Sequence, residues 1–182
     1  MHRRKLLVLD LDETLIHTTE RPLDRAPDFE YETYFVYRRP YLEDFLQYAF
    51  STFEVGVWTS AGLNYAQHVV RNIMEPSDLR FLWASRRCTI RRDFTTGQFG
   101  SVKRLTKLKS LGYRLENVIA IDDSPEKHTD NYGNLVHVAE FNGSSDDAEL
   151  LHLKKYLSIL SLEPNIRSVE KRGWRKHVEP GV

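Results

Sequence analysis

Four short stretches of the chain are apolar and end in polar or turn residues, which is the pattern of strands buried on both faces of a parallel sheet. They cover residues 5–10, 53–59, 117–122 and 135–139. We expect the first of them to be the central strand. Because parallel strands end on the same side of a sheet, the polar residues that follow them are expected to gather at one edge.

Segments of helical character lie between these strands. The sequence predicts helices over residues 40–49, with Pro40 in the first turn, and over residues 63–74, 101–111 and 146–160. The third has apolar residues at three-residue spacing and stops before Gly112, which can adopt positive φ. This alternation of strands and helices predicts an α/β fold with helices on both faces of the sheet.

Three stretches do not fit the alternation. Residues 29–38, rich in aromatic side chains, predict a strand whose rings either pack on the core or line a peptide groove. Residues 88–100, with Thr95-Thr96-Gly97 as a turn, predict a second β-excursion. Residues 164–182 are mixed in charge and weakly periodic, which is typical of an arm or a partly disordered tail. We therefore predict a domain at residues 1–162 and a C-terminal arm at residues 163–182.

Composition narrows the class of protein. The chain has 182 residues, 41% of them hydrophobic, enough for one buried core. Lysine and arginine total 26, as do aspartate and glutamate, so we expect no nucleic-acid or membrane partner. The lone cysteine, Cys88, cannot form an intramolecular disulfide. With no signal peptide or membrane span in the pattern, we expect a cytoplasmic or nuclear location.

The most informative motif is Asp10-Leu11-Asp12-Glu13-Thr14, directly after the first predicted strand. Carboxylates two residues apart at the end of a strand point the same way. One can attack phosphorus while the other donates a proton to the leaving oxygen and then activates water. Such a pair repels a phosphate dianion, so the electrostatics require a hard divalent cation, which we predict to be Mg²⁺. The alternative is a turn in which Asp and Thr only cap backbone amides.

Further polar residues follow the other strands. Asp122-Asp123-Ser124-Pro125 can complete a metal shell, and Thr59-Ser60 can bind phosphate oxygens. Lys103, early in the third predicted helix, can neutralise phosphate and orient the nucleophile. Taken singly, these are also explained as a turn, a helix cap and a solvated lysine. Their joint order along the chain favours a phosphoryl-transfer site.

At this point the motifs resemble the haloacid dehalogenase phosphatases, and within them the small phosphatases that act on the C-terminal domain of RNA polymerase II. The resemblance spans residues 6–160. It rests on the following blocks, which occur in the same order in that family: Asp10-Leu11-Asp12-Glu13-Thr14-Leu15-Ile16-His17, Arg39-Pro40-Tyr41-Leu42-Glu43-Asp44-Phe45-Leu46, Val57-Trp58-Thr59-Ser60-Ala61, Val102-Lys103-Arg104-Leu105 and Ile121-Asp122-Asp123-Ser124-Pro125.

The resemblance implies roles for the acids. Asp10 would become a phosphoaspartate, and Asp12 would serve as acid and then base while its backbone carbonyl binds Mg²⁺. Asp123 matches the metal-binding position of the family. Asp122 either ligates the ion or orients the site, and the sequence leaves both open. The predicted metal residues are therefore Asp10, Asp12, Asp122 and Asp123.

The resemblance also implies a Rossmann-like three-layer sandwich without a large cap domain. Thr14, Thr59, Ser60 and Lys103 would bind the transferred phosphoryl group. An uncapped site is open to phosphoserine or phosphothreonine of a protein or peptide, which we predict as the substrate. A small-molecule or nucleic-acid-end phosphatase would use the same residues, and a scaffold that has lost turnover would keep only the fold. The intact acid pair favours an enzyme.

Two departures from the family concern the substrate. Glu20 stands where the polymerase-tail phosphatases have an apolar residue for a substrate proline. The stretch of residues 88–103 is longer than in those enzymes, and it lies in a basic region that holds Arg86, Arg87, Arg91 and Arg92. These arginines either hold an acidic or multiply phosphorylated partner or belong to a solvated basic hairpin.

Overall fold

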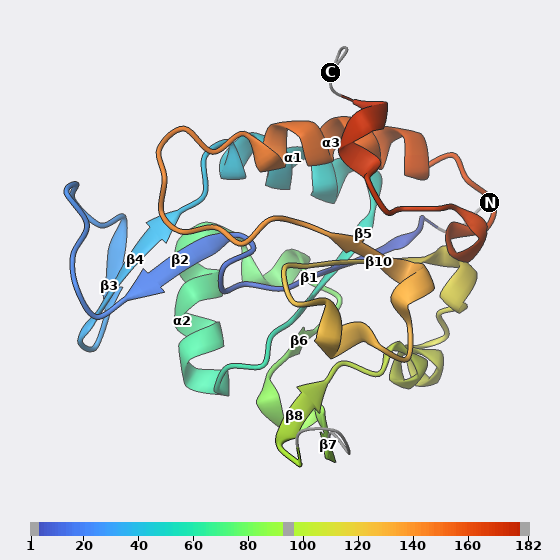
Figure 1. Ribbon diagram of the computed structural model, residues 1–182, viewed down its shortest axis with the longest axis horizontal. Helices are drawn as coiled ribbons and strands as arrows, with labels where there is room; N and C mark the ends of the chain where they lie inside the picture. Colours follow the sequence, from blue (N-terminus) through green and yellow to red (C-terminus); the bar gives the residue numbers. More distant parts are fainter. Residues whose placement is uncertain (1–3, 93–96, 179–182) are drawn as a thin grey trace.

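The computed structural model describes residues 4–92 and 97–178. Its centre is a five-stranded parallel sheet in the order β10-β9-β1-β5-β6 (Figure 1). The strands are β1 (Leu6–Leu9), β5 (Glu54–Trp58), β6 (Leu82–Trp83), β9 (Val118–Asp122) and β10 (Leu135–His137). The four predicted strands are confirmed, with β1 in the middle. The two-residue β6 was not predicted because it is too short to leave a pattern.

The register of the sheet sets the level at which the polar residues begin. Leu9 pairs with Val57 of β5 and with Ile121 of β9. The residue after Leu9 is Asp10, and the residue after Ile121 is Asp122. Carboxylates from two neighbouring strands therefore stand side by side at the carboxyl edge.

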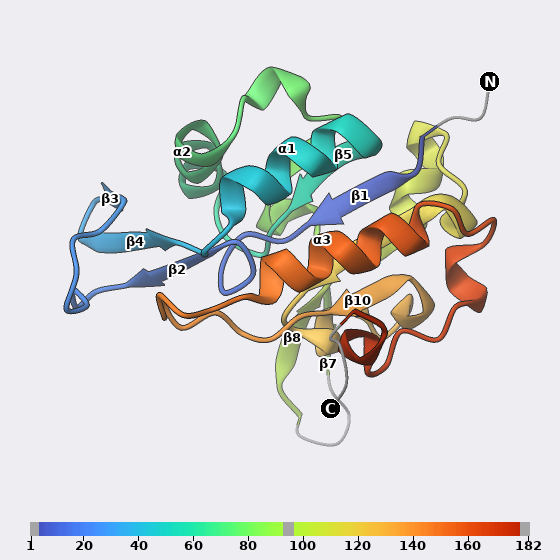
Figure 2. The same ribbon diagram turned by 90° about the horizontal axis from the view of Figure 1, so that it is seen from above.

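Side chains of the sheet alternate between two cores, which makes a three-layer α/β sandwich. Leu7 and Leu9 pack on the face covered by α1 (Leu42–Thr52) and α3 (Glu149–Leu160) (Figure 2). Leu6 and Val8 point to the opposite face and pack with Leu105 and Leu108 of a 3₁₀ segment, η3 (Leu105–Leu111). The helix α2 (Leu63–Ile73) lies beside β6 and buries Ala66, Val69 and Val70. The predicted fold class is confirmed.

A small antiparallel sheet follows the first motif. Its order is β2-β4-β3, with β2 at Ile16–Thr19, β3 at Phe29–Tyr31 and β4 at Tyr34–Arg38. The single strand predicted over residues 29–38 is therefore a hairpin, because Glu32 takes a left-handed conformation (φ 53°) and turns the chain. In the described part of the chain, this sheet and a second hairpin, formed by β7 (Thr89–Arg92) and β8 (Phe99–Val102), are the insertions into the sandwich, and neither amounts to a large cap.

The second excursion is a hairpin of β7 (Thr89–Arg92) and β8 (Phe99–Val102). Residues 93–96 of its predicted turn lie outside the described residues. The helix predicted over residues 101–111 was wrong: its first residues pair with β7, and the remainder is the 3₁₀ segment η3. Apolar residues at three-residue spacing match the period of a 3₁₀ helix rather than an α-helix. Gly112 ends the segment at φ 83°, as expected.

Two helix starts differ from the prediction. The first helix begins at Leu42 rather than at Pro40, because Tyr41 takes a left-handed conformation (φ 64°) and breaks the run. Helix α3 begins at Glu149 rather than at residue 146. There the carboxylate of Asp147 accepts a hydrogen bond of 2.9 Å from the Glu149 amide, which satisfies one free N–H of the helix end.

The described part of the C-terminal segment, residues 163–178, packs on the body of the protein. Ile166 and Trp174 are buried, at 0% and 1% exposure, in the same core as α1 and α3. The Trp174 ring stacks on Tyr156 at 5.3 Å, and its Nε1 donates a hydrogen bond of 2.8 Å to the His137 carbonyl of β10. These few anchors in irregular structure give no periodic signal, which is why the pattern indicated an arm or a partly disordered tail.

Membrane-spanning geometry is absent from residues 4–92 and 97–178: none of their helices combines the length and apolar character needed to cross a bilayer.

Candidate active site

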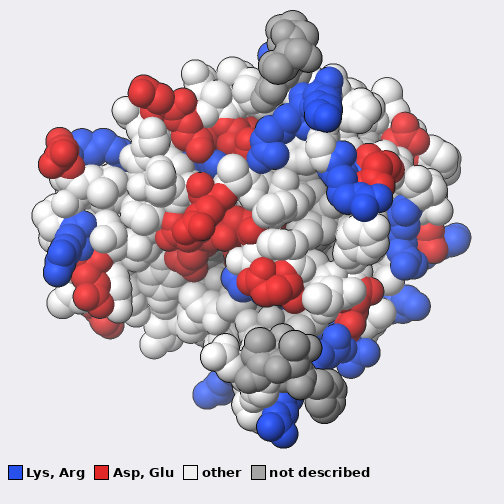
Figure 3. Space-filling model, in the orientation of Figure 1, with Lys and Arg blue, Asp and Glu red and all other residues white. Residues whose placement is uncertain are grey.

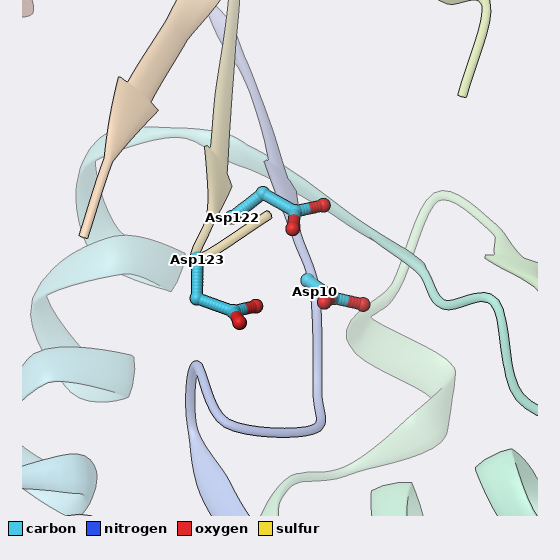
Figure 4. A group of neighbouring side chains, drawn as sticks. All are labelled: Asp10, Asp122 and Asp123. Carbon is cyan, nitrogen blue, oxygen red and sulfur yellow. The ribbon is translucent and has the colours of Figure 1, made fainter. Parts of the chain in front are cut away.

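Three carboxylates meet at the carboxyl edge of the sheet. Asp10 follows β1, Asp122 ends β9, and Asp123 follows it. Each offers an oxygen atom, and these oxygens lie within 4.8 Å of one another. Figure 4 shows the three side chains leaving neighbouring strands and pointing to the same side. We call this group the acid cluster.

Lys103 lies inside the acid cluster. Its Nζ is 2.8 Å from Oδ1 of Asp10 and 2.5 Å from Oδ2 of Asp122, and its side chain is 1% exposed. The backbone holds it there: its amide donates to the Lys127 carbonyl at 2.8 Å, and its carbonyl accepts from the Asn131 side chain at 2.9 Å. Lys103 is therefore a fixed, buried cation shared by two carboxylates.

The acids of the cluster ionise differently. Burial raises the pKa of Asp10 to about 7, against the opposing effect of Lys103. Burial also opposes ionisation of Asp122, but Lys103 and His128 outweigh it and hold the pKa of Asp122 well below its usual value. His128 Nε2 lies 3.0 Å from Oδ2 of Asp122. A further cation beside Asp10 would favour its ionised, nucleophilic form.

Asp123 has the neighbours expected of an oriented metal ligand. The Thr14 hydroxyl donates to its Oδ1 at 3.2 Å, and the Ser124 hydroxyl donates to its Oδ2 at 3.3 Å. The oxygens of Asp122, in contrast, already face Lys103, His128 and the Ser124 amide. An all-oxygen donor set fits Mg²⁺, and the geometry favours Asp123 over Asp122 as the direct ligand.

Asp12 stands apart from the acid cluster and is held by other groups. The hydroxyl of Tyr65, from α2, donates a very short hydrogen bond to Asp12 Oδ1, and the Thr59 hydroxyl donates to Oδ2 at 3.5 Å. Burial raises the pKa of Asp12, while the bond from Tyr65 lowers it. Asp12 is thus placed to exchange a proton without being tied to Lys103.

The predicted hydroxyl residues occupy different places. Thr59 Oγ1 accepts a hydrogen bond of 3.0 Å from the Ala61 amide and does not cap α2, whose N-cap is Gly62. The Ser60 hydroxyl lies 3.1 Å from the Ser101 hydroxyl of β8, so its side chain joins the site to the hairpin. Thr14 is buried on Asp123, which favours an orienting role. Direct phosphate binding by Thr14, Thr59 and Ser60 stays a prediction.

Sequence reasoning missed three neighbours of the site. Lys127 and His128 follow the Asp122-Asp123-Ser124-Pro125 motif, and Lys127 Nζ lies 4.0 Å from Asp10 Oδ2. Their position just past that motif was a usable signal. Tyr65 had none, because nothing in a helix pattern indicates that a tyrosine ring reaches a distant acid.

Acidic side chains gather on one face of the molecule. Figure 3 shows Asp and Glu side chains gathered near the middle of the face seen in Figure 1, with most Lys and Arg nearer its margins. A phosphate dianion that approaches this face is repelled unless a cation offsets the carboxylates.

A three-layer α/β fold with a lysine-bridged acid cluster at the carboxyl edge defines a phosphatase of the haloacid dehalogenase type. The sequence matches the family of NLI interacting factor-like phosphatases over residues 5–169, and the chain belongs to this family. The predicted family and the prediction of a phosphoric monoester hydrolase are confirmed at the level of that family.

Proteins with similar sequences carry names of the same kind. A CTD phosphatase-like protein of Invertebrate iridescent virus 3 is 29% identical, with 86% of this chain and 96% of the relative covered. The human CTD small phosphatase-like protein is 30% identical over 93% of this chain, and the match spans 60% of the human protein. A solved structure of fission yeast RNA polymerase II CTD phosphatase Fcp1 bound to beryllium fluoride has a TM-score of 0.56 at 22% identity. It covers 87% of this chain and 51% of that one, and it supports the fold.

Proposed function

We propose that this protein is a Mg²⁺-dependent phosphatase that removes phosphate from phosphoserine or phosphothreonine of a protein or peptide. The observation that carries the proposal is the division of the site: a buried Asp10 paired with Lys103, and a separate Asp12 held by Tyr65. Phosphoester hydrolysis through a covalent phosphoenzyme intermediate needs both a nucleophile and a proton donor.

In the first step, a carboxylate oxygen of Asp10 forms a bond to phosphorus and the bond from phosphorus to the alcohol oxygen breaks. Asp12 gives its proton to that oxygen, so the alcohol leaves neutral. In the second step, Asp12 takes a proton from a water molecule whose oxygen forms a bond to phosphorus, the bond from phosphorus to the Asp10 oxygen breaks, and inorganic phosphate and the free Asp10 carboxylate result. Lys103 stabilises the negative charge at Asp10 and on the phosphoryl oxygens throughout.

Mg²⁺ would be held by Asp10, Asp123 and the Asp12 backbone carbonyl, with Asp122 orienting the site through Lys103. When bound, it offsets the charge of the carboxylates and of the phosphate dianion. The all-oxygen donors of the acid cluster support this choice of ion.

We infer the size of the substrate from residues 4–92 and 97–178, which form no large cap over the site. An uncapped site cannot enclose a small metabolite and exclude water by itself, so the bulk of a protein substrate is expected to cover it. The named activity of the relatives on a CTD agrees with a phosphoprotein substrate. We propose a cytoplasmic or nuclear location, where such substrates occur.

Hydrolysis of para-nitrophenyl phosphate tests the chemistry. We expect turnover by the wild-type protein with Mg²⁺, none with a chelator, and none with Asp10→Asn. Asp78→Asn removes an exposed acid far from the cluster in sequence and is the matched control with full activity. A folded wild-type protein without turnover would support the scaffold alternative instead.

A further inference from the structure

A groove of about 780 Å³ lies next to the candidate active site. Its walls are the N-terminal turn of α2, the strand β6 and the following 3₁₀ turn η2 (Ser85–Arg87), with Tyr31 of β3 at one side. Helix α2 and β6 are neighbours in the fold (Figure 1). The volume is within the range of sites that bind compact ligands, about 300–1,000 Å³.

One residue, Tyr65, connects the groove to the candidate active site. Tyr65 lines the groove and donates its hydroxyl hydrogen bond to Asp12. The two walls are joined at this end, because the Ser85 amide donates to the Ala61 carbonyl at 2.9 Å, two residues after Thr59. A chain segment that brings phosphate to Asp10 can therefore extend past Tyr65 into the groove.

The lining of the groove is apolar and basic. The described residues that line it include Leu63, Phe81, Leu82 and Trp83, together with Arg86 and Arg87, and none of them is an aspartate or glutamate. The Arg87 guanidinium lies over the Trp83 ring at 5.0 Å. The adjacent end of α2 has no acid in its first turn and no side-chain cap, so its dipole adds to the positive potential.

The arginines of this region divide into two groups. Arg91 makes two hydrogen bonds of 2.8 Å to Asp130, and the Arg92 side chain donates to the Gly97 carbonyl at 3.4 Å. Among the described residues, neither Arg86 nor Arg87 forms an ion pair with a carboxylate. The two arginines that line the groove are thus the ones that remain available for an acidic ligand.

We propose that this groove binds the segment of the phosphoprotein next to the phosphorylated residue, and that it selects an acidic group there. Arg86 and Arg87 pair with a carboxylate or a second phosphate, and Leu63 and Trp83 contact an apolar neighbour. This inference rests on the proposed function and names the substrate class: peptides with an acidic or second phosphorylated residue near the target phosphoserine.

The test uses three peptides with one central phosphoserine that differ at flanking positions, which carry Gln, Glu or a second phosphoserine. Affinity is measured by calorimetry with the Asp10→Asn protein, which holds the peptide without turnover. We expect the Glu peptide to bind about tenfold tighter than the Gln peptide, as for charge-assisted pairs at a partly exposed site. The second phosphoserine peptide distinguishes a phosphate from a carboxylate as the preferred group.

Arg86→Gln with Arg87→Gln, in the same background, is expected to abolish this preference. Arg114→Gln is the matched control, since its side chain is 81% exposed and lies outside the groove lining. In the protein with Asp10 intact, the double variant is expected to lose in kcat/KM for the Glu peptide relative to the Gln peptide, while para-nitrophenyl phosphate, which has no flanking residue for the groove, shows whether the variant still turns over a substrate.

Equal affinity for the Glu and Gln peptides, or a preference that survives in the double variant, would overturn the inference. Either result is independent of turnover. A phosphatase that is active on all peptides alike would keep the proposed function and lose the groove. Selective binding without turnover by the wild-type protein would keep the peptide-binding groove and refute the proposed phosphatase function.

Discussion

The hydrogen bond from Tyr65 to Asp12 allows a quantitative test of the general-acid role. Tyr65→Phe removes one hydroxyl group and keeps the ring. Burial raises the pKa of Tyr65, so the hydroxyl stays protonated and acts as a donor to Asp12 Oδ1. Its other contact is the Thr18 hydroxyl at 2.7 Å. The substitution therefore removes the main constraint on the orientation of the Asp12 carboxyl.

The size of the effect follows from the type of bond. Asp12 becomes a carboxylate as it gives up its proton, and a hydrogen bond to a charged group contributes about 1.5–3 kcal/mol, which corresponds to a rate factor of roughly 10 to 150. The loss falls on the step in which the leaving oxygen takes a proton. Serine is a poor leaving group and needs that proton, whereas para-nitrophenol leaves as its anion. We expect kcat/KM to fall about 10- to 150-fold for a phosphoserine peptide and less than about threefold for para-nitrophenyl phosphate.

The assay compares kcat/KM of the wild type and Tyr65→Phe on both substrates, because kcat/KM reports the first chemical step. Tyr132→Phe removes the hydroxyl of a tyrosine that is 63% exposed and serves as the matched control. Circular dichroism checks that the variants fold. An equal loss on both substrates, or no loss on either, would refute the assignment of Tyr65 as the residue that positions a proton donor.

Three further predictions concern stability and the metal. Lys103→Met leaves the buried Asp10 carboxylate without its counter-ion and is expected to cost about 3–5 kcal/mol, read as a Tm lower by roughly 6–20 °C. Asp147→Asn removes the partner of the buried Arg39, with which it makes two hydrogen bonds of 2.8 Å, and is expected to lower the free energy of unfolding by about 1–3 kcal/mol in urea titrations at pH 7. Burial opposes ionisation of Asp147, but Arg39 outweighs this effect and holds the pKa of Asp147 below its usual value. The stabilisation from the Asp147–Arg39 pair is therefore complete above about pH 4 and is lost as the pH falls through the folded-state pKa of Asp147. In acid, the free energies of unfolding of the wild type and the variant are expected to converge. Mg²⁺ is expected to raise the Tm of the wild type by about 5–11 °C at a hundredfold excess over its Kd and to have little effect on Asp123→Asn; an equal shift in both would contradict the ligand assignment.

The parallel strands could be predicted from the sequence because each is a continuous apolar run that ends in polar residues. The strands of the small antiparallel sheet could not all be predicted in this way. Of the four residues of Ile16–Thr19, only Ile16 is fully buried, so β2 has neither a run nor an alternation to detect. The segment Leu105–Leu111 was predicted as part of a longer α-helix over residues 101–111. The pairing of Val102 with Thr89 removes the first residues from any helix, and this long-range contact leaves no local signal in the sequence.

The site residues also divide into those with a local sequence signal and those that depend on long-range contacts. Asp10 and Asp122 were found because each stands at the end of a predicted strand, and parallel register then places them together. Lys103 was found through the resemblance and its charge, although it precedes η3 and does not lie on a helix. Tyr65 was missed because its contact with Asp12 depends on how α2 packs against the sheet, which no local pattern records.

The position of Trp174 has a consequence for where this domain can be cut. β10 is the outermost strand on its side of the sheet, and the Trp174 indole occupies the His137 carbonyl there. The match to the family ends at residue 169, before this tryptophan. A chain shortened to the matched residues would keep every candidate catalytic side chain and would uncover the His137 carbonyl on this edge strand; exposed edge groups are the feature through which separate molecules join edge to edge. For this protein, the residues needed for the candidate active site therefore end earlier in the chain than the residues that cover the edge of the sheet.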